Sequence, residues 1–126
     1  MHFTEDQPWG NYIINEYDDN SVTINHEQFQ NSLFVSPNQL IRDIPIKGIE
    51  DLNHKSLQSI IELKPELVIL GTGPKQIFPH PSILGLFANH GIGLEIMNHP
   101  SACRTYTILS AEQRKVGMIL ILSSDN

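Results

Sequence analysis

Cysteine is almost absent from this sequence, and so are segments that would direct it into a membrane or an export pathway. Cys103 is the single cysteine, so no disulfide can form within the chain, and a reducing compartment is the expected setting. The longest apolar run, Met118 to Leu122, is too short to cross a bilayer, and the acidic N-terminus lacks the basic and apolar regions of a secretory signal. We therefore expect a cytoplasmic protein without stable membrane insertion.

Positive charge is also scarce. The 126 residues include 8 Lys and Arg against 14 Asp and Glu, which gives a formal net charge of -6, and no run of five basic residues occurs. Because phosphate contacts need clustered cationic side chains, nucleic acid is excluded as the main partner. The length and the hydrophobic content of 40% predict a single domain over residues 1–126, with an irregular arm at 1–10 and a polar tail at 123–126.

The first half of the chain predicts strands and turns. Polar and apolar residues alternate at 21–26, as in a strand with one solvated face, and Asp18-Asp19-Asn20 provides turn chemistry just before it. We therefore expect an N-terminal β-hairpin. The strands expected before the first helix cover residues 12–17, 21–26 and 32–35, with a further extended piece at 40–46.

Helices and strands alternate from residue 53 onward, which is typical of an α/β domain. Asn53 is suited to cap a first helix that Pro65 ends, and Pro81 is suited to the first turn of a second helix. A third helix is predicted to begin near Pro100. The strands predicted between and after these helices cover residues 67–70, 92–97 and 116–122.

A loop with two glycines follows the predicted strand at 67–70. Gly71-Thr72-Gly73-Pro74-Lys75 lets backbone amides approach an anion or another chain closely. The dinucleotide pattern G-x-G-x-x-G is not met, because Gln76 stands where the third glycine is required, and no Gly-Lys-Ser/Thr completes a P-loop. A tight turn accounts for the same glycines, so an anion-binding loop and a structural turn both stay open.

The end of the next strand leads to the only thiol. Cys103 is predicted in the first turn of a helix, where the helix dipole, Arg104 and the nearby base His99 would favour a thiolate. The same position falls on the side of the helix that faces the sheet, where cysteine behaves as a small apolar residue. Arg104 has the geometry to bind a carboxylate or phosphate, although a structural ion pair is favoured. The acidic partners considered for that pair are Glu66, Glu95 and Glu112.

Histidines and carboxylates form no recognisable metal or acid–base motif. The six histidines contain no H-x-x-x-H or H-E-x-x-H pair, so a metal site would have to be assembled by the fold alone. Glu95 and Glu112 are single carboxylates without a visible acid–base partner. We therefore expect no cofactor and no metal, and we assign no catalytic residue.

The strand ends taken together resemble one family of small α/β proteins. The matching runs are PELVILGTG at 65–73, GIGLEIM at 91–97, ACRTY at 102–106, LSAEQRKV at 109–116 and FVSP at 34–37. In this order and spacing they resemble the Mth-type domain family of proteins of unknown function. That family includes mitochondrial complex I (NADH dehydrogenase) assembly factor three and the adipogenesis-associated domain protein. The resemblance covers nearly the whole chain, from Tyr12 to Leu122.

The resemblance implies a three-layer single domain around a mixed sheet, with an antiparallel strand near the centre and helices packed on the sheet. It also implies action through protein partners, as the mitochondrial relative acts. We therefore expect a non-catalytic protein-binding or assembly-factor-like module whose partner is another protein, and the oligomeric state stays open. The alternative is a small-molecule or anion-binding protein, or an enzyme, that uses the Gly71-Thr72-Gly73 loop with Cys103 and Arg104.

The candidate functional surface joins the two strand ends. The chain departs from the family pattern there, since relatives usually carry Asp-Thr where this sequence has Asn98-His99. Asparagine keeps the ability to cap a helix but lacks the charge of aspartate. The candidate residues are Gly71, Thr72, Gly73, Lys75, Asn98, His99, Cys103, Arg104 and Thr105.

Overall fold

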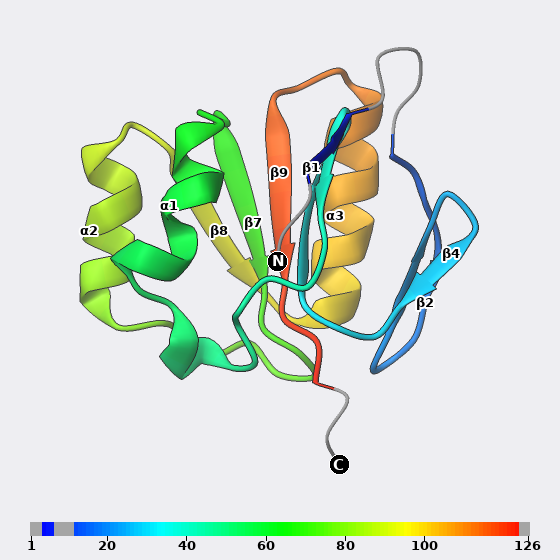
Figure 1. Cartoon of the computed structure of the whole chain (residues 1–126), viewed down its shortest axis with the longest axis horizontal. Coiled ribbons are helices and arrows are strands. Elements are labelled where there is room, and N and C mark those ends of the chain that lie inside the picture. The colour runs from blue at the N-terminus through cyan, green and yellow to red at the C-terminus, as the bar shows by residue number, and fades with distance from the viewer. Residues whose placement is uncertain (1–3, 7–11, 124–126) are drawn as a thin grey trace.

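A six-stranded mixed sheet forms the centre of the protein (Figure 1). The computed structural model describes residues 4–6 and 12–123. The strand order is β1-β6-β5-β9-β7-β8; β7, β8 and β9 are parallel, whereas β5 lies antiparallel between β6 and β9. This arrangement confirms the expected mixed sheet. Its strands are β1 (Thr4–Asp6), β5 (Leu33–Ser36), β6 (Gln39–Ile41), β7 (Leu67–Gly71), β8 (Gly93–Met97) and β9 (Val116–Leu120).

A second, three-stranded antiparallel sheet contains the predicted hairpin. Its strands are β2 (Ile14–Tyr17), β3 (Val22–Ile24) and β4 (Glu27–Phe29), in the order β2-β3-β4. The expected strand at 21–26 ends early, because Asn25 and His26 have φ of 48° and 70° and turn the chain back into β4. β4 was not predicted from sequence, since three residues that are mostly polar carry no usable alternation.

Three helices confirm the predicted alternation. Asn53 caps the first, because its side-chain oxygen accepts a hydrogen bond from Ser56 N at 2.8 Å and the Ser56 hydroxyl accepts one from Asn53 N at 3.0 Å. Pro81 is the first residue of the second helix, as expected. In the ranges that the structure describes, no helix is long and apolar enough to cross a membrane. The helices are α1 (His54–Glu62), α2 (Pro81–Asn89) and α3 (His99–Ala111), with a short 3₁₀ turn at Ile49–Asp51.

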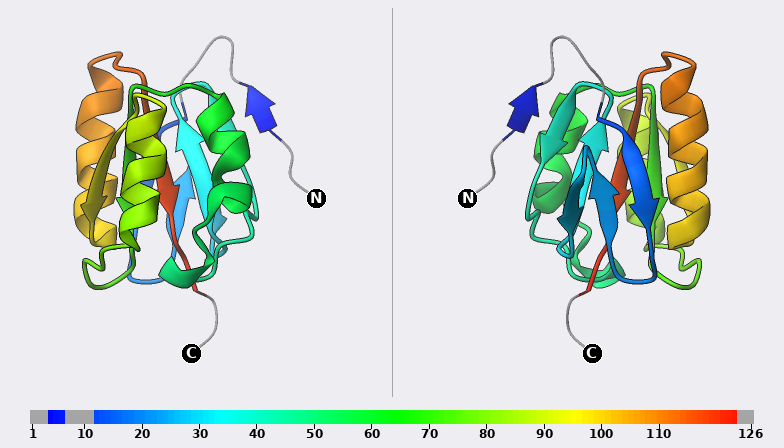
Figure 2. Two further views of the ribbon diagram at one scale, coloured as in Figure 1. Left: turned by 90° about the vertical axis from the view of Figure 1, so that its left-hand side faces the viewer. Right: turned by 90° about the vertical axis from the view of Figure 1, so that its right-hand side faces the viewer.

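The layers follow from the alternation of buried side chains along the strands. Phe34 of β5 and Val68 of β7 belong to the core beneath α1 and α2, whereas their neighbours Val35 and Ile69 belong to the core beneath α3 and the small sheet. Figures 1 and 2 show α1 and α2 on one side of the large sheet and α3 with the small sheet on the other. The predicted three-layer α/β domain is confirmed.

The expected irregular arm at 1–10 needs a correction. Residues Thr4–Asp6 form β1, which pairs antiparallel with β6, so that Glu5 lies opposite Leu40. An unpaired edge of β6 can accept any extended segment, and three acidic or polar residues carry too little pattern to reveal it. The rest of that arm lies outside the described residues, as does the predicted tail after Ser123.

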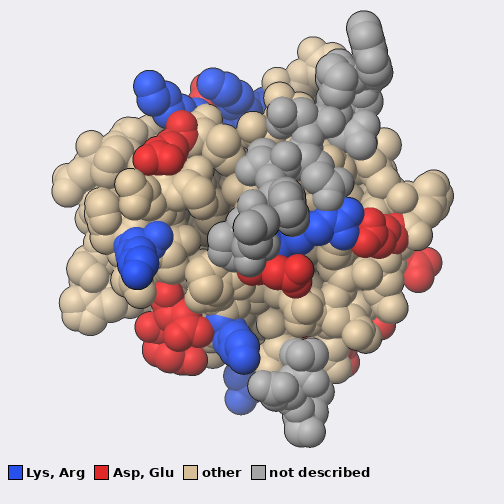
Figure 3. Space-filling model, in the orientation of Figure 1, with Lys and Arg blue, Asp and Glu red and all other residues tan. Residues whose placement is uncertain are grey.

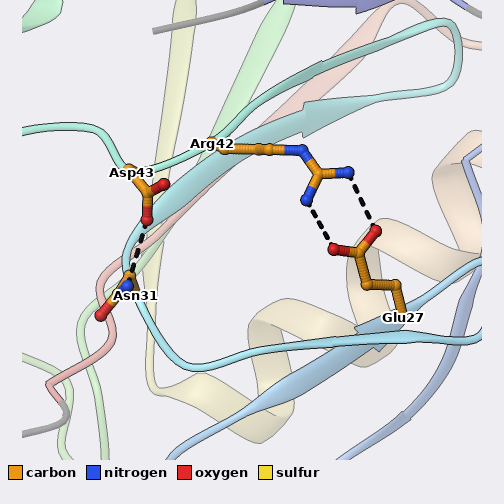
Figure 4. A network of polar contacts seen from close by, with 4 residues as sticks. All are labelled: Glu27, Asn31, Arg42 and Asp43. Atoms are coloured by element: carbon orange, nitrogen blue, oxygen red, sulfur yellow. Dashed lines mark hydrogen bonds and ion pairs between the residues drawn. The ribbon is translucent and has the colours of Figure 1, made fainter. Parts of the chain in front are cut away.

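Polar contacts connect the small sheet to the edge of the large one (Figure 4). Arg42 follows β6 and forms a two-point ion pair with Glu27 of β4, with N–O distances of 2.6 and 2.9 Å. The same guanidinium lies 4.9 Å from the ring centre of Phe29. Asn31 donates a hydrogen bond to Asp43 at 3.1 Å in the neighbouring turn. These contacts fix the hairpin region against the sheet that carries the candidate site.

Candidate functional site

The two strand ends named from the sequence meet at one edge of the large sheet. Gly71 of β7 lies opposite Met97 of β8, at the carboxyl ends of both strands. Thr72 N then donates a hydrogen bond to Met97 O at 2.9 Å, and His99 N donates one to Gly73 O at 2.7 Å. The loop after β7 and the start of α3 therefore form one connected edge.

Gly71 lets α3 approach the sheet closely. A Cβ atom at this position would lie 2.7 Å from Leu120 Cδ1 and 3.1 Å from the Cβ of Ala102, which are closer than ordinary contacts. Thr72 is only 7% exposed; its hydroxyl donates to Lys75 O at 2.6 Å and accepts from Ile77 N at 3.0 Å. These polar groups are engaged within the loop, which favours the structural turn over the anion-binding loop.

The loop after Gly71 presents apolar side chains to solvent. Ile77 is 45% exposed and Phe78 is 65% exposed, which is unusual for two large apolar residues in sequence. The loop is held at its start and in its middle: the Thr72 hydroxyl bonds to two backbone groups inside the loop, and Gln76 Nε2 donates to Ile96 O at 2.8 Å. We call residues 72–80 the edge loop. Ile77 and Phe78 were not among the residues predicted from sequence. An apolar pair between Pro74 and Pro79 that belongs to no helical or strand pattern is nevertheless a sign of an exposed apolar surface.

Asn98 and His99 have structural roles at the start of α3. Asn98 caps the helix, since its Oδ1 accepts a hydrogen bond from Ser101 N at 3.0 Å, and the expected capping by asparagine is confirmed. His99 is 1% exposed. Its Nε2 lies 3.1 Å from Ser21 O, and its ring meets the Tyr17 ring edge-on with centres 5.9 Å apart. His99 therefore links α3 to the small sheet and does not face solvent as a base.

Cys103 is a core residue. Its side chain is 0% exposed and belongs to the cluster that contains Ala102 and Tyr106. Burial raises the pKa of the Cys103 thiol to about 12, because desolvation disfavours the thiolate, and the opposing effect of Arg104 is smaller. The position facing the sheet is confirmed. Of the two alternatives left open by the sequence, the structure thus supports the small apolar residue over the thiolate nucleophile.

Arg104 is exposed and points toward the small sheet. Its guanidinium donates to Ser101 Oγ at 3.3 Å and reaches the Tyr17 hydroxyl at 3.5 Å. The favoured structural ion pair was wrong: within the described ranges no ion pair joins Arg104 to Glu66, Glu95 or Glu112. The reason is its place on α3, which directs the side chain toward β2. Its guanidinium stays accessible to a partner.

The nine candidate residues therefore divide by exposure. Gly73, Asn98 and Thr105 are partly exposed and Lys75 and Arg104 are exposed, whereas Gly71, Thr72, His99 and Cys103 are buried. Across the part of the chain that the structure covers, no three His, Cys, Asp or Glu side chains lie together as metal ligands would. What remains at this edge is a fixed, partly apolar surface with amide and guanidinium donors, which is suited to binding.

A family model and several named proteins are similar in sequence to much of this chain. The family described as "Protein of unknown function (DUF498/DUF598)" matches residues 14–121. The "13 kDa major membrane protein" of Francisella tularensis is 28% identical over 96% of this chain and 99% of its own length. The mouse "NADH dehydrogenase [ubiquinone] 1 alpha subcomplex assembly factor 3" is 35% identical over 57% of this chain. The match covers only 40% of the mouse protein.

Solved structures share the fold over nearly the whole chain. An NMR structure of a Xanthomonas campestris protein is 29% identical, with a TM-score of 0.86 over 97% of this chain and 92% of that one. The NMR structure of a Bordetella pertussis protein described as a Mth938-like domain is 24% identical, with a TM-score of 0.77 over 91% of this chain and 88% of that one. The latter likeness concerns the fold alone.

Proposed function

Because the chain belongs to the DUF498/DUF598 family of Mth938-like domains, which includes complex I assembly factor 3, we propose that it is a non-catalytic protein-binding module of the assembly-factor kind. The observation that carries the proposal is the edge loop, where Ile77 and Phe78 are exposed on a backbone fixed by hydrogen bonds. An exposed aromatic side chain on a preorganised loop is a favourable anchor for a protein partner, because little ordering is left for binding.

The groups around the edge loop fit the same role. Lys75 lies in the edge loop two residues before Ile77 and is exposed, so a cationic group is available close to the apolar pair. The buried, protonated Cys103 and the engaged Thr72 hydroxyl support a site that binds without covalent chemistry. The enzyme alternative would need a nucleophile that these residues do not supply at the edge.

The partner that we propose is a protein subunit destined for a membrane-bound complex. The name of the mouse relative supports this class of partner, and the name of the Francisella relative supports a place beside a membrane. We propose that the chain meets this subunit from the cytoplasmic side, through the edge loop.

Comparative affinity purification from cells that express the protein tests the proposal. The bait is the full chain, compared with the double variant Ile77→Ser/Phe78→Ser and with the matched control Ile108→Ser, which replaces another apolar residue that is 60% exposed. We expect subunits of a membrane complex to be enriched by the parent and by the control, and lost with the double variant. Circular dichroism and melting curves establish that all three baits are folded.

Two results would contradict the proposal. One is a parent bait that enriches no protein above the level of an unrelated chain of the same size. The other is a double variant that retains the same partners as the parent, since the edge loop would then be outside the interface.

A further inference from the structure

A separate pocket lies at the opposite end of the sheet from the edge loop, where the parallel strands begin. Its volume is about 340 Å³, which lies within the range of small-molecule sites. Three connections meet there: the turn between β5 and β6, the segment after α1, and the segment between α3 and β9. We call it the amino-end pocket. Its described lining is Phe34, Ser36, Pro37, Asn38, Gln39, Leu63, Pro65, Ser110, Gln113, Arg114, Lys115 and Val116.

The pocket has an apolar base and a polar rim. Phe34 and Val116 are each 1% exposed, and together with the half-buried Leu63 they offer an apolar surface. Asn38 and Gln113 are exposed, and their amides can donate hydrogen bonds at the rim. A ligand that fits this lining has an apolar body and a polar head.

The charge of the lining determines the sign of that head. The chain has a net charge of -6, yet the described lining includes Arg114 and Lys115 and no Asp or Glu. Glu66 lies nearby and accepts from Lys115 N at 3.4 Å, but it is not part of the lining. Figure 3 shows several Lys and Arg side chains along the upper edge of the molecule, with Asp or Glu side chains beside them, at the end where α1 finishes and β9 begins.

Other hollows of the protein do not share this charge. A hollow beside Pro45 is lined by both Lys47 and Asp43, and another beside α1 is lined by both Lys55 and Glu62. A third, between α1 and α2, is lined by no Lys, Arg, Asp or Glu among the described residues. Unpaired cationic lining is therefore a property that distinguishes the amino-end pocket from these three.

The helix ends at this pocket give independent support. A residue in the left-handed conformation follows each helix, and glycine is the usual choice because other residues are strained there. The end of α2, away from the pocket, follows this rule with Gly91 at φ 69°. The ends of α1 and α3 instead carry Lys64 at φ 54° and Gln113 at φ 60°. Both helices end near the pocket, and Gln113 is part of its lining, so a left-handed residue with a polar side chain stands where a ligand could use it.

We propose that the amino-end pocket binds a small organic anion, in which a carboxylate or phosphate is attached to an apolar ring or chain. The apolar body lies against Phe34, Leu63 and Val116, and Arg114 and Lys115 bind the anionic head. This activity goes beyond the proposed protein binding and uses the opposite end of the molecule.

Titration of the ¹⁵N-labelled full chain, followed by NMR, tests the proposal with three probes. They are 2-naphthoate, the uncharged 2-naphthalenemethanol with the same rings, and inorganic phosphate, which has charge without an apolar body. We expect 2-naphthoate to shift the amide signals of Ser36, Asn38, Gln39 and residues 110–116 saturably. The alcohol and phosphate should each bind at least about tenfold more weakly, because the alcohol lacks the anionic head and phosphate lacks the apolar body.

Variants locate the site. Arg114→Ala/Lys115→Ala, in which both side chains are exposed, should weaken 2-naphthoate binding at least about tenfold, whereas the control Lys47→Ala/Lys55→Ala should not. The proposal is overturned if 2-naphthoate shifts no amide in these two segments, if the alcohol or phosphate binds as tightly as the naphthoate, or if the Arg114→Ala/Lys115→Ala variant retains the parent's affinity. A failure of this kind leaves the edge-loop experiment unaffected.

Discussion

The Nε2 atom of His99 lies 3.1 Å from the carbonyl oxygen of Ser21, across 78 residues of sequence. Since a carbonyl oxygen only accepts hydrogen bonds, Nε2 carries the proton in this contact. The bond joins the first turn of α3 to the start of β3, and the edge-on Tyr17 ring completes the contact. His99 thus holds the small sheet against the helix that begins at the candidate surface.

Replacing His99 should therefore weaken the fold. His99→Ala leaves the Ser21 carbonyl without its donor and removes a buried ring, so the free energy of unfolding should fall by about 2–4 kcal/mol. His99→Gln, which keeps a donor at a similar reach, should recover part of this loss. Urea denaturation of the parent, His99→Ala and His99→Gln measures the free energy of unfolding of each. Equal stability of His99→Ala and the parent would show that the contact contributes nothing.

Tyr106 lies about two helical turns after His99 on the buried side of α3. Its hydroxyl is buried and has no hydrogen-bond partner in the part of the chain that the structure describes. Removing an unsatisfied buried group relieves a desolvation penalty, so Tyr106→Phe should leave the free energy of unfolding unchanged or raise it by about 1 kcal/mol. Urea denaturation decides this as well. A loss above about 1 kcal/mol would reveal a hydrogen bond of that hydroxyl.

Two glycines should respond oppositely to alanine. Gly71→Ala places a Cβ atom 2.7 Å from Leu120 Cδ1 where α3 meets the sheet, and should destabilise the protein by about 1–3 kcal/mol. Gly85→Ala, inside α2 with no atom within 4 Å of the added Cβ, should stabilise it by about 0.5–1 kcal/mol. Melting curves compare the two. A Gly71→Ala variant at least as stable as the parent would contradict the packing role of Gly71, and a destabilised Gly85→Ala variant would contradict the prediction for α2.

Cys103 should resist alkylation in the folded protein. Its side chain has no exposed surface, and at pH 8 a thiol with a pKa of about 12 is almost entirely protonated. We expect iodoacetamide to react with Cys103 of the native chain at least about a hundredfold more slowly than with glutathione. In denaturant, Cys103 of the unfolded chain should react at about the same rate as glutathione. Mass spectrometry follows both reactions. Fast labelling of the native chain would restore the thiolate hypothesis.

The same burial limits stability at alkaline pH. The pKa of Cys103 is raised from 9.0 to about 12 on folding, so the folded chain keeps a proton that the unfolded chain releases. The stability from this group is fully present below pH 9 and is lost as pH rises toward the folded pKa. Cys103→Ala should therefore show a smaller loss of unfolding free energy between about pH 8 and about pH 10.5 than the parent. Equal slopes in the two proteins would exclude this linkage.

The ion pair between Glu27 and Arg42 should contribute modestly to stability. Both side chains are partly exposed, at 53% and 31%, so Glu27→Gln should reduce the unfolding free energy by at most about 1 kcal/mol near neutral pH. The hydrogen bonds from Arg42 lower the pKa of Glu27 from its ordinary 4.5, so this contribution is present above pH 4.5 and is lost as pH falls through the lowered pKa. Urea titrations at several pH values measure it. A difference that persists in strong acid would point to packing in place of charge.

The sequence predicted elements whose pattern is local. Apolar runs revealed β7, β8 and β9. Asn53, Pro81 and Pro100 indicated the three helix starts, because capping and the first helical turn depend on a few neighbouring residues. β4 was missed because three mostly polar residues gain their pairing only from β3. The resemblance to a family, together with this alternation, predicted the layers.

Features that depend on distant residues were not predictable in the same way. The ion pair expected for Arg104 was wrong because the position of β2 beside α3, rather than the local sequence, decides what its guanidinium meets. The amino-end pocket combines Ser36, Leu63 and Arg114, which only the strand order brings together. The exposure of Phe78 likewise follows from the path of the edge loop.

The position of β9 has a consequence for folding. β9 pairs with β5 on one side and with β7 on the other, and in the described sheet no other strand joins the antiparallel half to the parallel half. As the chain leaves the ribosome, β5 and β7 are therefore both complete before the strand that separates them exists. Until residue 120 emerges, each presents an open hydrogen-bonding edge in a largely apolar strand, the kind of edge that invites aggregation. The newly made chain is therefore most exposed to edge-to-edge aggregation in the interval before β9 is complete.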